Sequence, residues 1–407
     1  MPDLFEGLFR ESAGSLVSIL TRTLGARHLD LAEECVQDAL IKAMEKWPFH
    51  GVPNNPRAWL LRAARNRAID VLRRDRRLVE ITDLEAIEVD ATGVDEELGM
   101  VFLCCHPALP REAQVALILK TVGGLGVREI ARAYLMPEAA IAQRLVRAKS
   151  KLRDLQAEFD LPQAMADCQG RLDSVLEALY LLFNEGYSVY APEFSEEAIR
   201  LGRLLVRNPV TALPRTHALF ALMLLQSARD GARVDPNGGG VVILQDQDRS
   251  LWNRERIAEG IHHIDLAGHG DALSRYHLEA GIASLHALAE SWEATDWRAI
   301  CRLYVHLETV HPTAVVRLNR AVAESQCHGP SDGLTLLDGE LEQYLAGYPP
   351  FYAVKGHLLE RAGQKNEAKA YFKKASEAAR TGIERSFFER RARQNVGNFR
   401  RTVTVIR

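Results

Sequence analysis

The chain has 407 residues, of which 47% are hydrophobic and 26% charged, and its net charge is −3. This length predicts two to four domains, since one domain takes roughly 100–200 residues, and the composition is that of a soluble globular protein. No window approaches the roughly 20 uncharged apolar residues that span a bilayer, which argues against a membrane segment. The acidic N-terminus is unlike a signal peptide, and six irregularly spaced cysteines are typical of reduced thiols in the cytoplasm.

Charge is distributed unevenly over the first 155 residues. Eight arginines and two aspartates give residues 57–77 a net charge of +6, and eight acids with no Lys or Arg give residues 80–97 a charge of −8. Five bases and one acid give residues 138–153 a charge of +4. Two basic blocks on either side of an acidic stretch favour a polyanionic partner bound at two points, although charged helices are more often solvated faces.

Helical periodicity dominates the chain, and no alternating stretch is long enough to predict a sheet, so the expected fold class is all-α. A turn rich in Pro and Gly, with exposed aromatic rings, is expected from Trp47 to Asn55. Pro56 then suits the first turn of a helix that Asn54 or Asn55 caps. Helices are expected over residues 4–25, 30–46 and 56–77, with further helical blocks over 95–155 and from about 165 to the end.

The C-terminal part carries an internal repeat. Gly329 and Gly363 lie 34 residues apart in similar surroundings, and Thr295 lies 34 residues upstream of Gly329 between two helical segments. This period is that of the tetratricopeptide repeat, whose stacked helix pairs form concave surfaces for a peptide or another protein. The alternative is an irregular helical bundle, and residues 171–270 show no period.

The basic helix that begins at Pro56 has two different faces. Its apolar stripe comprises Leu61, Ala64, Ala68, Val71 and Leu72, and another stripe comprises Arg62, Arg65, Asn66, Ile69 and Arg73. Such a helix can lie against a duplex, because guanidinium groups bind phosphate or guanine and asparagine can read adenine. From these residues alone, RNA, an acidic protein or no partner at all remains open.

The motifs around this helix resemble region 2 of an extracytoplasmic-function (ECF) sigma factor. The resemblance is carried by residues 30–40, Trp59-Leu60, Asn66, Asp70 and Arg73-Arg74. It implies that the preceding helix docks on the clamp coiled coil of the polymerase β′ subunit, through Val36, Gln37 and Asp38.

The same resemblance implies a site for the −10 element of a promoter. In the family, the loop before the third helix captures a flipped base, and stacking and edge contacts offset the cost of extruding that base. The expected −10 contacts are Trp47, Phe49, His50, Arg62, Arg65, Asn66 and Arg73. Trp59 is a further aromatic candidate. Core packing is the alternative for each aromatic residue, and it is favoured for Trp59 because that side chain adjoins the apolar stripe.

Residues 111–153 have the pattern of a helix–turn–helix. A short helix is expected over Gly126–Leu135, a turn at Met136-Pro137 and a second helix from Glu138, with inward positions at Ile141, Leu145, Ala148 and Leu152. Arg144, Arg147 and Lys151 share another face, as expected for a helix that enters the major groove.

This segment is similar to sigma region 4, which reads the −35 element. The expected contacts are Gln143, Arg144, Arg147 and Lys151. Many sigma factors have Gly-Thr or Gly-Ser where this chain has Ala139-Ala140, so base readout is expected to shift to Gln143, Arg144 and Arg147. The acidic stretch between the two regions threads the RNA-exit path in the family, where it can mimic RNA, and a solvated linker is the alternative.

The whole chain resembles the ECF class in which a tetratricopeptide-like extension follows regions 2 and 4. The later segments that carry this resemblance are Phe102–Leu109, Tyr180–Tyr187 and Leu244–Trp252. The resemblance implies that the extension regulates or supports transcription, with a regulatory protein as a further partner. Four domains are expected: residues 1–78 (region 2), 79–97 (acidic linker), 98–155 (region 4 helix–turn–helix) and 165–407 (a helical, tetratricopeptide-like domain).

The sequence therefore predicts a cytoplasmic sigma factor that binds core RNA polymerase (β and β′ subunits) and promoter DNA. Catalytic residues, cofactors and membrane contacts are not expected. Metal binding is not expected at Cys104-Cys105-His106 or around His262-His263, because the spacing converges poorly on one ion. A polymerase-independent helix–turn–helix regulator with a repeat sensor domain is the alternative, although such a protein has no reason to carry region 2. A hydrolase using Glu185 or Asp246 is the least favoured reading.

Overall fold

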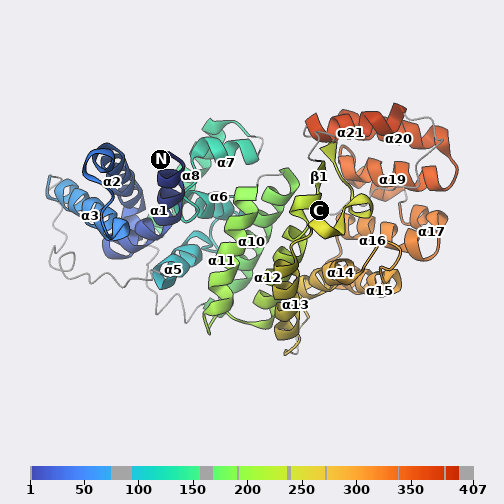
Figure 1. Cartoon of the computed structure of the whole chain (residues 1–407), viewed down its shortest axis with the longest axis horizontal. Helices are drawn as coiled ribbons and strands as arrows, with labels where there is room; N and C mark the ends of the chain where they lie inside the picture. The colour runs from blue at the N-terminus through green and yellow to red at the C-terminus, as the bar shows by residue number, and fades with distance from the viewer. Residues whose placement is uncertain are drawn as a thin grey trace. The chain divides into compact units, whose positions relative to one another are not determined.

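The described chain is almost wholly helical (Figure 1), which confirms the all-α prediction. The exception is a pair of two-residue antiparallel strands, β1 Val234–Asp235 and β2 Gly240–Val241. Two compact units make up the chain, Met1–Ala212 and Leu213–Arg407. The computed structural model describes residues 2–74, 94–134, 136–155, 168–189, 192–235, 240–270, 273–337, 339–379 and 382–393. Most of the acidic stretch lies outside these residues.

Three helices form the N-terminal module of the first unit: α1 Pro2–Leu24, α2 Leu29–His50 and α3 Pro56–Arg74. They pack against one another, and the predicted apolar stripe of α3 faces the core, with Leu61, Ala64, Ala68 and Leu72 buried and Val71 half-buried. The Asn55 side chain accepts a hydrogen bond from the Ala58 backbone N–H at 3.0 Å, so Asn55 caps α3.

Helix α2 is one turn longer than the sequence predicts. It runs through Pro48 to His50 and ends at Gly51, whose φ of 79° lies in the left-handed region that favours glycine. The prediction that the turn begins at Trp47 is therefore wrong. Trp47 is buried at 4% exposure against Trp59, and this burial offsets the cost of a proline inside a helix.

Four further helices follow in the first unit: α5 Val94–Cys104, α6 Arg111–Thr121, α7 Val127–Ala133 and α8 Glu138–Asp154. Helix α6 is their centre, since its residues from Ala113 to Leu119 are all buried. The Gln114 side-chain amide donates to the carbonyl oxygens of His106 (3.2 Å) and Leu109 (3.1 Å) and so holds the turn before α6. The predicted inward positions of α8, Ile141, Leu145, Ala148 and Leu152, are buried. Helices α7 and α8 form the predicted helix–turn–helix.

The first unit also contains α10 Cys168–Val189 and α11 Pro192–Arg207, which the sequence placed in the C-terminal domain. Helix α10 packs on α5 and α6. Two ion pairs join the extension to these helices: Arg111 of α6 with Glu177 of α10 at 2.9 Å, and Arg200 of α11 with Glu97 of α5 at 2.5 Å. The start of the extension therefore folds together with the helix–turn–helix module.

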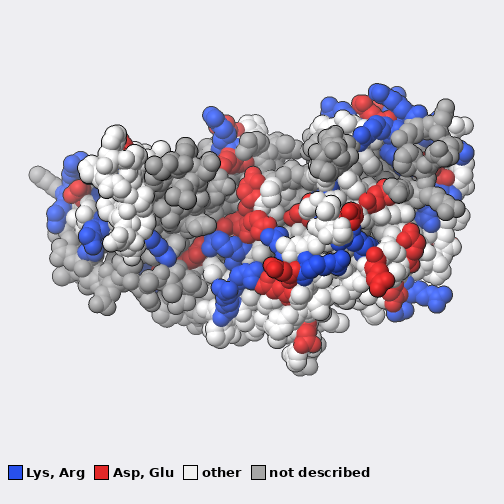
Figure 2. Space-filling view, in the orientation of Figure 1, with Lys and Arg blue, Asp and Glu red and all other residues white. Residues whose placement is uncertain are grey.

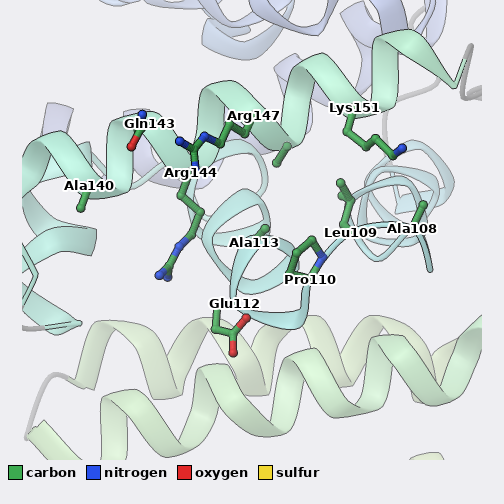
Figure 3. Close-up of a pocket in the computed structure, with 11 residues that line it drawn as sticks. Ala108, Leu109, Pro110, Glu112, Ala113, Ala140, Gln143, Arg144, Arg147 and Lys151 are labelled. Carbon is green, nitrogen blue, oxygen red and sulfur yellow. The ribbon is translucent and has the colours of Figure 1, made fainter.

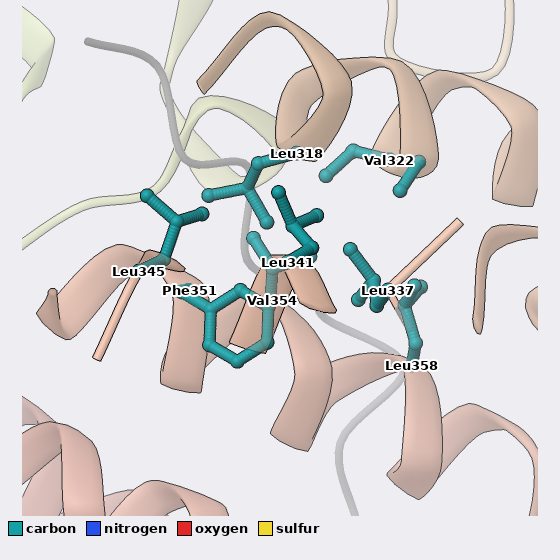
Figure 4. Close-up of a cluster of buried hydrophobic side chains, with 9 residues drawn as sticks. Leu318, Val322, Leu337, Leu341, Leu345, Phe351, Val354 and Leu358 are labelled. Atoms are coloured by element: carbon teal, nitrogen blue, oxygen red, sulfur yellow. The ribbon is translucent and has the colours of Figure 1, made fainter. Parts of the chain in front are cut away.

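The second unit is a succession of helices in which chain neighbours pack on one another, notably α12 with α13, α15 with α16 and α19 with α20. One of its cores lies between α16, α18 and α19 and includes Leu318, Leu341, Phe351 and Leu358 (Figure 4). The helices are α12 Pro214–Ser227, α13 Arg254–Ala267, α14 Arg275–Leu288, α15 Trp297–Val310, α16 Ala314–Cys327, α17 Pro330–Thr335, α18 Gly339–Tyr344, α19 Pro349–Arg361, α20 Lys365–Ala378 and α21 Gly382–Arg393.

The two repeat glycines occupy equivalent turns. Gly329 (φ 113°) follows α16 and Gly363 (φ 83°) follows α19, and each residue precedes another helix. The helix after Gly363 is a single element, α20, whereas the chain after Gly329 forms two short helices, α17 and α18. The tetratricopeptide period stays a prediction, because the chain after the two glycines does not form the same helices.

Candidate nucleic-acid interface

The outer face of α3 carries the Arg/Asn stripe that the sequence predicts. Arg62, Asn66 and Arg73 are exposed, and Arg65 is half-buried. The opposite face of the same helix is anchored in the core, so these side chains cannot turn inward without unpacking α3. The structure therefore presents one amide and several guanidinium groups along a rigid helix, an arrangement that can contact phosphates and base edges.

The aromatic residues before α3 have different surroundings. Trp47 is buried and meets Trp59 edge-on, with ring centroids 5.5 Å apart. Phe49 is 85% exposed, and His50 is exposed with its Nδ1 3.1 Å from the Lys46 carbonyl oxygen. Phe49 and His50 are thus available to an unstacked base, whereas Trp47 supports the end of α2 from within. For Trp47 and Trp59 the structure favours core packing.

The exposed face of α2 contains two residues that the sequence analysis missed. Of the predicted polymerase contacts, Val36 is buried, Gln37 is exposed and Asp38 is half-buried in an ion pair with Arg67 at 2.7 Å. Ile41 and Met44 are 53% and 57% exposed. Gln37, Ile41 and Met44 are spaced by four and three residues, so they follow one side of the helix. That spacing, with two apolar residues on an otherwise polar helix face, was the sequence signal that could have identified Ile41 and Met44.

The predicted −35 residues gather along α8. Gln143, Arg144, Arg147 and Lys151 line an open pocket of about 440 Å³, which the start of α6 closes from the other side (Figure 3). Gln143, Arg147 and Lys151 are exposed. Three cationic groups on one helical face give this surface a preference for anions.

Arg144 differs from its neighbours on α8. Its side chain is half-buried, with the guanidinium carbon 5.8 Å from the centre of the Tyr134 ring, and Nη1 finds no hydrogen-bond partner among the described residues. Burial raises the pKa of Tyr134 well above its ordinary value, so its phenol stays neutral beside Arg144. Arg144 is therefore partly committed to packing, whereas Gln143, Arg147 and Lys151 face solvent.

The opposite side of α8 contacts the N-terminal module. Lys149 Nζ lies 2.9 Å from Asp30 and 2.8 Å from Glu33, and Arg153 lies 2.9 Å from Asp30. Lys149 is largely removed from solvent, yet the two carboxylates raise its pKa above the ordinary value despite that burial. The ammonium group therefore stays charged and links α2 to α8.

The two modules also meet at their backbones. A Cβ placed on Gly14 of α1 would lie 1.8 Å from the Val122 carbonyl oxygen, so only glycine allows this approach. The N-terminal three-helix module and the helix–turn–helix are thus in direct contact within the first unit.

Metal and membrane sites find no support within the described ranges. No group of three or more His, Cys, Asp or Glu side chains there is arranged to hold a metal ion. Burial raises the pKa of Cys104 to about 12, and its thiol lies 3.2 Å from the Thr121 hydroxyl, so it is a poor thiolate donor. None of the described helices is long and apolar enough to cross a bilayer.

Figure 2 shows basic and acidic side chains interspersed on the visible face. The basic faces of α3 and α8 are therefore identified from their individual residues and not from a charged patch in this view.

Comparison with known families matches three segments of the chain. Residues 8–78 match Sigma-70 region 2, residues 100–152 match Sigma-70 region 4, and residues 171–268 match a family of unknown function, DUF6596. The chain is also 41% identical over 397 residues to an uncharacterized protein of Rhizobium meliloti (strain 1021), covering 92% of this chain and 93% of that protein.

A chain with regions 2 and 4 in this order, on the helices described above, belongs to the sigma-70 class of promoter-recognition proteins. More narrowly, the chain is an ECF sigma factor with a helical C-terminal extension. Regions 2 and 4 imply core RNA polymerase and promoter DNA as its partners and the cytoplasm as its location.

Proposed function

We propose that this sigma factor divides promoter recognition between two described surfaces. Arg62, Asn66 and Arg73 of α3, with Phe49 and His50, bind the −10 element. Gln143, Arg147 and Lys151 of α8 bind the −35 element. The observation that carries the proposal is the exposure of these side chains on helices whose opposite faces are buried.

Transcription by core polymerase with the full chain tests the role of α8. Arg147→Ala combined with Lys151→Ala is expected to abolish transcription from a −35-dependent promoter while leaving binding to core polymerase unchanged. Both side chains are exposed, so the fold should tolerate the change. Arg302→Ala, an exposed arginine of α15 in the extension, is the matched control and should retain full activity. Lost core binding in the double variant would contradict the assignment to DNA.

The face of α2 formed by Gln37, Ile41 and Met44 is proposed as the contact for the β′ clamp. Exposed apolar side chains of this size are costly in water and gain by burial in an interface. Met44→Glu is therefore expected to prevent co-migration with core polymerase on size exclusion, in competition with the housekeeping sigma factor. Lys46→Glu introduces the same charged residue at another exposed position of α2 and serves as the control, which should still bind core polymerase.

Unaltered binding by Met44→Glu would reject this surface. Failure of the native chain itself to bind core polymerase would instead favour the alternative, a polymerase-independent helix–turn–helix regulator. The two outcomes are therefore distinct.

We further propose that the extension supports the −35 module through α10 and α11. The packing of α10 on α5 and α6, with the Arg200–Glu97 pair, favours this role. Arg200→Met leaves the buried Glu97 carboxylate without this partner and is expected to lower −35-dependent transcription. Glu177→Gln breaks a pair whose arginine is 60% exposed and should have little effect. Equal activity of both variants would argue against support by the extension.

A further inference from the structure

Two cysteines of the second unit lie against each other on neighbouring helices. Cys301 is in α15 and Cys327 is the last residue of α16, and their Sγ atoms are 3.0 Å apart. Both are free thiols. This separation is shorter than an ordinary non-bonded contact of two sulfurs, and a disulfide needs about 2.0 Å. Closing the bond therefore requires a shift of about 1 Å between two packed side chains.

The other cysteines whose side chains the structure describes are in unlike positions. Cys35, Cys104 and Cys105 are buried. Burial raises the pKa of the Cys35 thiol to about 11, and Cys104 is engaged by Thr121. The close approach at Cys301 and Cys327 is thus a property of the α15–α16 pair.

Solvent reaches one cysteine of the pair more readily than the other. Cys301 is 8% exposed and lies in the apolar cluster of α14, α15 and α16, which includes Leu278, Ile300 and Val316. Cys327 is half-buried at the end of α16, beside the exposed His328, whose Nδ1 is 2.9 Å from Glu324. A small oxidant can therefore reach Cys327 first, with Cys301 directly behind it.

The charges around the pair favour this order. Burial raises the pKa of Cys301 well above its ordinary value, and the neighbouring Cys327 and Glu324 add to this effect while Arg320 opposes it. The inner thiol therefore stays protonated, and it is a poor first nucleophile. Cys327 is the residue that meets an oxidant from solution.

We infer that Cys301 and Cys327 are a redox-active pair that closes to a reversible disulfide with a peroxide as oxidant. The Cys327 sulfur attacks one peroxide oxygen, the O–O bond breaks, and a sulfenic acid and one water form. The Cys301 sulfur then attacks the sulfenic sulfur, the S–O bond breaks, and the hydroxide takes the Cys301 proton as a second water. Two thiols lose two electrons in total, and one hydrogen peroxide becomes two waters.

The disulfide would join the two helices at a point where they already pack. Because it closes the chain segment from residue 301 to residue 327, it restricts the unfolded state and should raise the melting temperature of the second unit by on the order of 10 °C. This site is independent of promoter recognition, so its test needs no transcription.

Peptide mapping of the wild-type full-length chain tests the pair directly. The reduced protein is treated with hydrogen peroxide, remaining thiols are blocked with N-ethylmaleimide, and the chain is digested without reductant. We expect a Cys301–Cys327 linked peptide, lighter by two hydrogens than its parts and separated by dithiothreitol. Peptides in which both cysteines carry the blocking group, under conditions that oxidise a model dithiol, would overturn the inference.

Two variants separate the pair from nonspecific oxidation. Cys35→Ser should form the same linked peptide as the wild type, whereas Cys327→Ser should leave Cys301 open to alkylation after denaturation. Rapid oxidation of Cys301 in the Cys327→Ser variant would contradict the proposed order of attack. Peptide mapping of the wild-type chain shows whether the Cys301–Cys327 disulfide forms, even where a variant folds poorly.

Discussion

The ion pairs between α2 and α8 predict a large effect for one substitution, Lys149→Met. The change keeps the length of the side chain and removes its charge. The Lys149 side chain is 11% exposed and that of Glu33 is 10% exposed, so the loss leaves a buried carboxylate without its ammonium partner. Breaking a buried pair from one side costs about 3–5 kcal/mol, more than the pair itself contributes over apolar residues.

Arg153→Ala is the matched control, because this arginine binds the same Asp30 from the surface. Its side chain is 53% exposed, and an exposed pair contributes about 0–1 kcal/mol. Scanning calorimetry of the full chain should show the transition of the first unit lowered by on the order of 10 °C in Lys149→Met. The control should move that transition by no more than about 3 °C.

A rescue variant separates a lost ion pair from a packing defect. Replacing Glu33 by Leu together with Lys149→Met removes both charges, and an apolar pair of similar volume is often as stable as the buried ion pair. Most of the lost stability should therefore return. A Lys149→Met transition as high as that of Arg153→Ala would refute the reasoning, because it would mean that α2 and α8 are not in contact in solution.

Three further changes have definite expectations. Phe49→Ala should leave the melting temperature unchanged but lower promoter opening, measured by permanganate footprinting, about tenfold, as expected for lost base stacking of about 1–3 kcal/mol. Trp47→Ala should instead lower the free energy of unfolding, measured by urea denaturation, by about 3–5 kcal/mol. Reversed results would exchange the roles of the two residues. Gly14→Ala should cost about 1–3 kcal/mol in urea denaturation because its Cβ meets the Val122 carbonyl, and a stabilised variant would show that the modules separate. Burial, with two neighbouring guanidinium groups, lowers the pKa of His286 to about 3. Below pH about 6.5 the unfolded chain binds a proton that the folded chain does not, so stability should fall by about 1.4 kcal/mol per pH unit down to about pH 3. His286→Phe should remove this part of the acid dependence, and identical pH profiles would contradict it.

Local features of this protein were predictable from its sequence. The inward residues of α8, the apolar stripe of α3 and the Asn55 cap depend on helical periodicity and on hydrogen bonds over three residues. The order of regions 2 and 4 was recognisable because their motifs lie within short stretches. The candidate DNA contacts were predicted from the same helical periodicity, because the charged residues of α3 and α8 lie on a different face from the apolar residues.

The tertiary structure decided which of those candidates face solvent. Trp47 and Phe49 stand two residues apart in similar sequence surroundings, yet one packs on Trp59 and the other is 85% exposed. Val36 was expected at a polymerase contact and is buried, because its side of α2 faces the core. Periodicity places side chains on faces of a helix, but the neighbouring helices determine which face is covered.

Contacts between distant segments were beyond the reach of the sequence. The Lys149–Glu33 pair joins residues 116 positions apart, and the sulfurs of Cys301 and Cys327 meet across 26 positions. Motifs that resemble sigma regions 2 and 4 indicated a helical sigma factor with an extension, whereas the packing of α10 on α6 and the ion pairs between α8 and α2 needed coordinates. Such contacts depend on the relative rotation and depth of whole helices, which many side chains set together and no local pattern records.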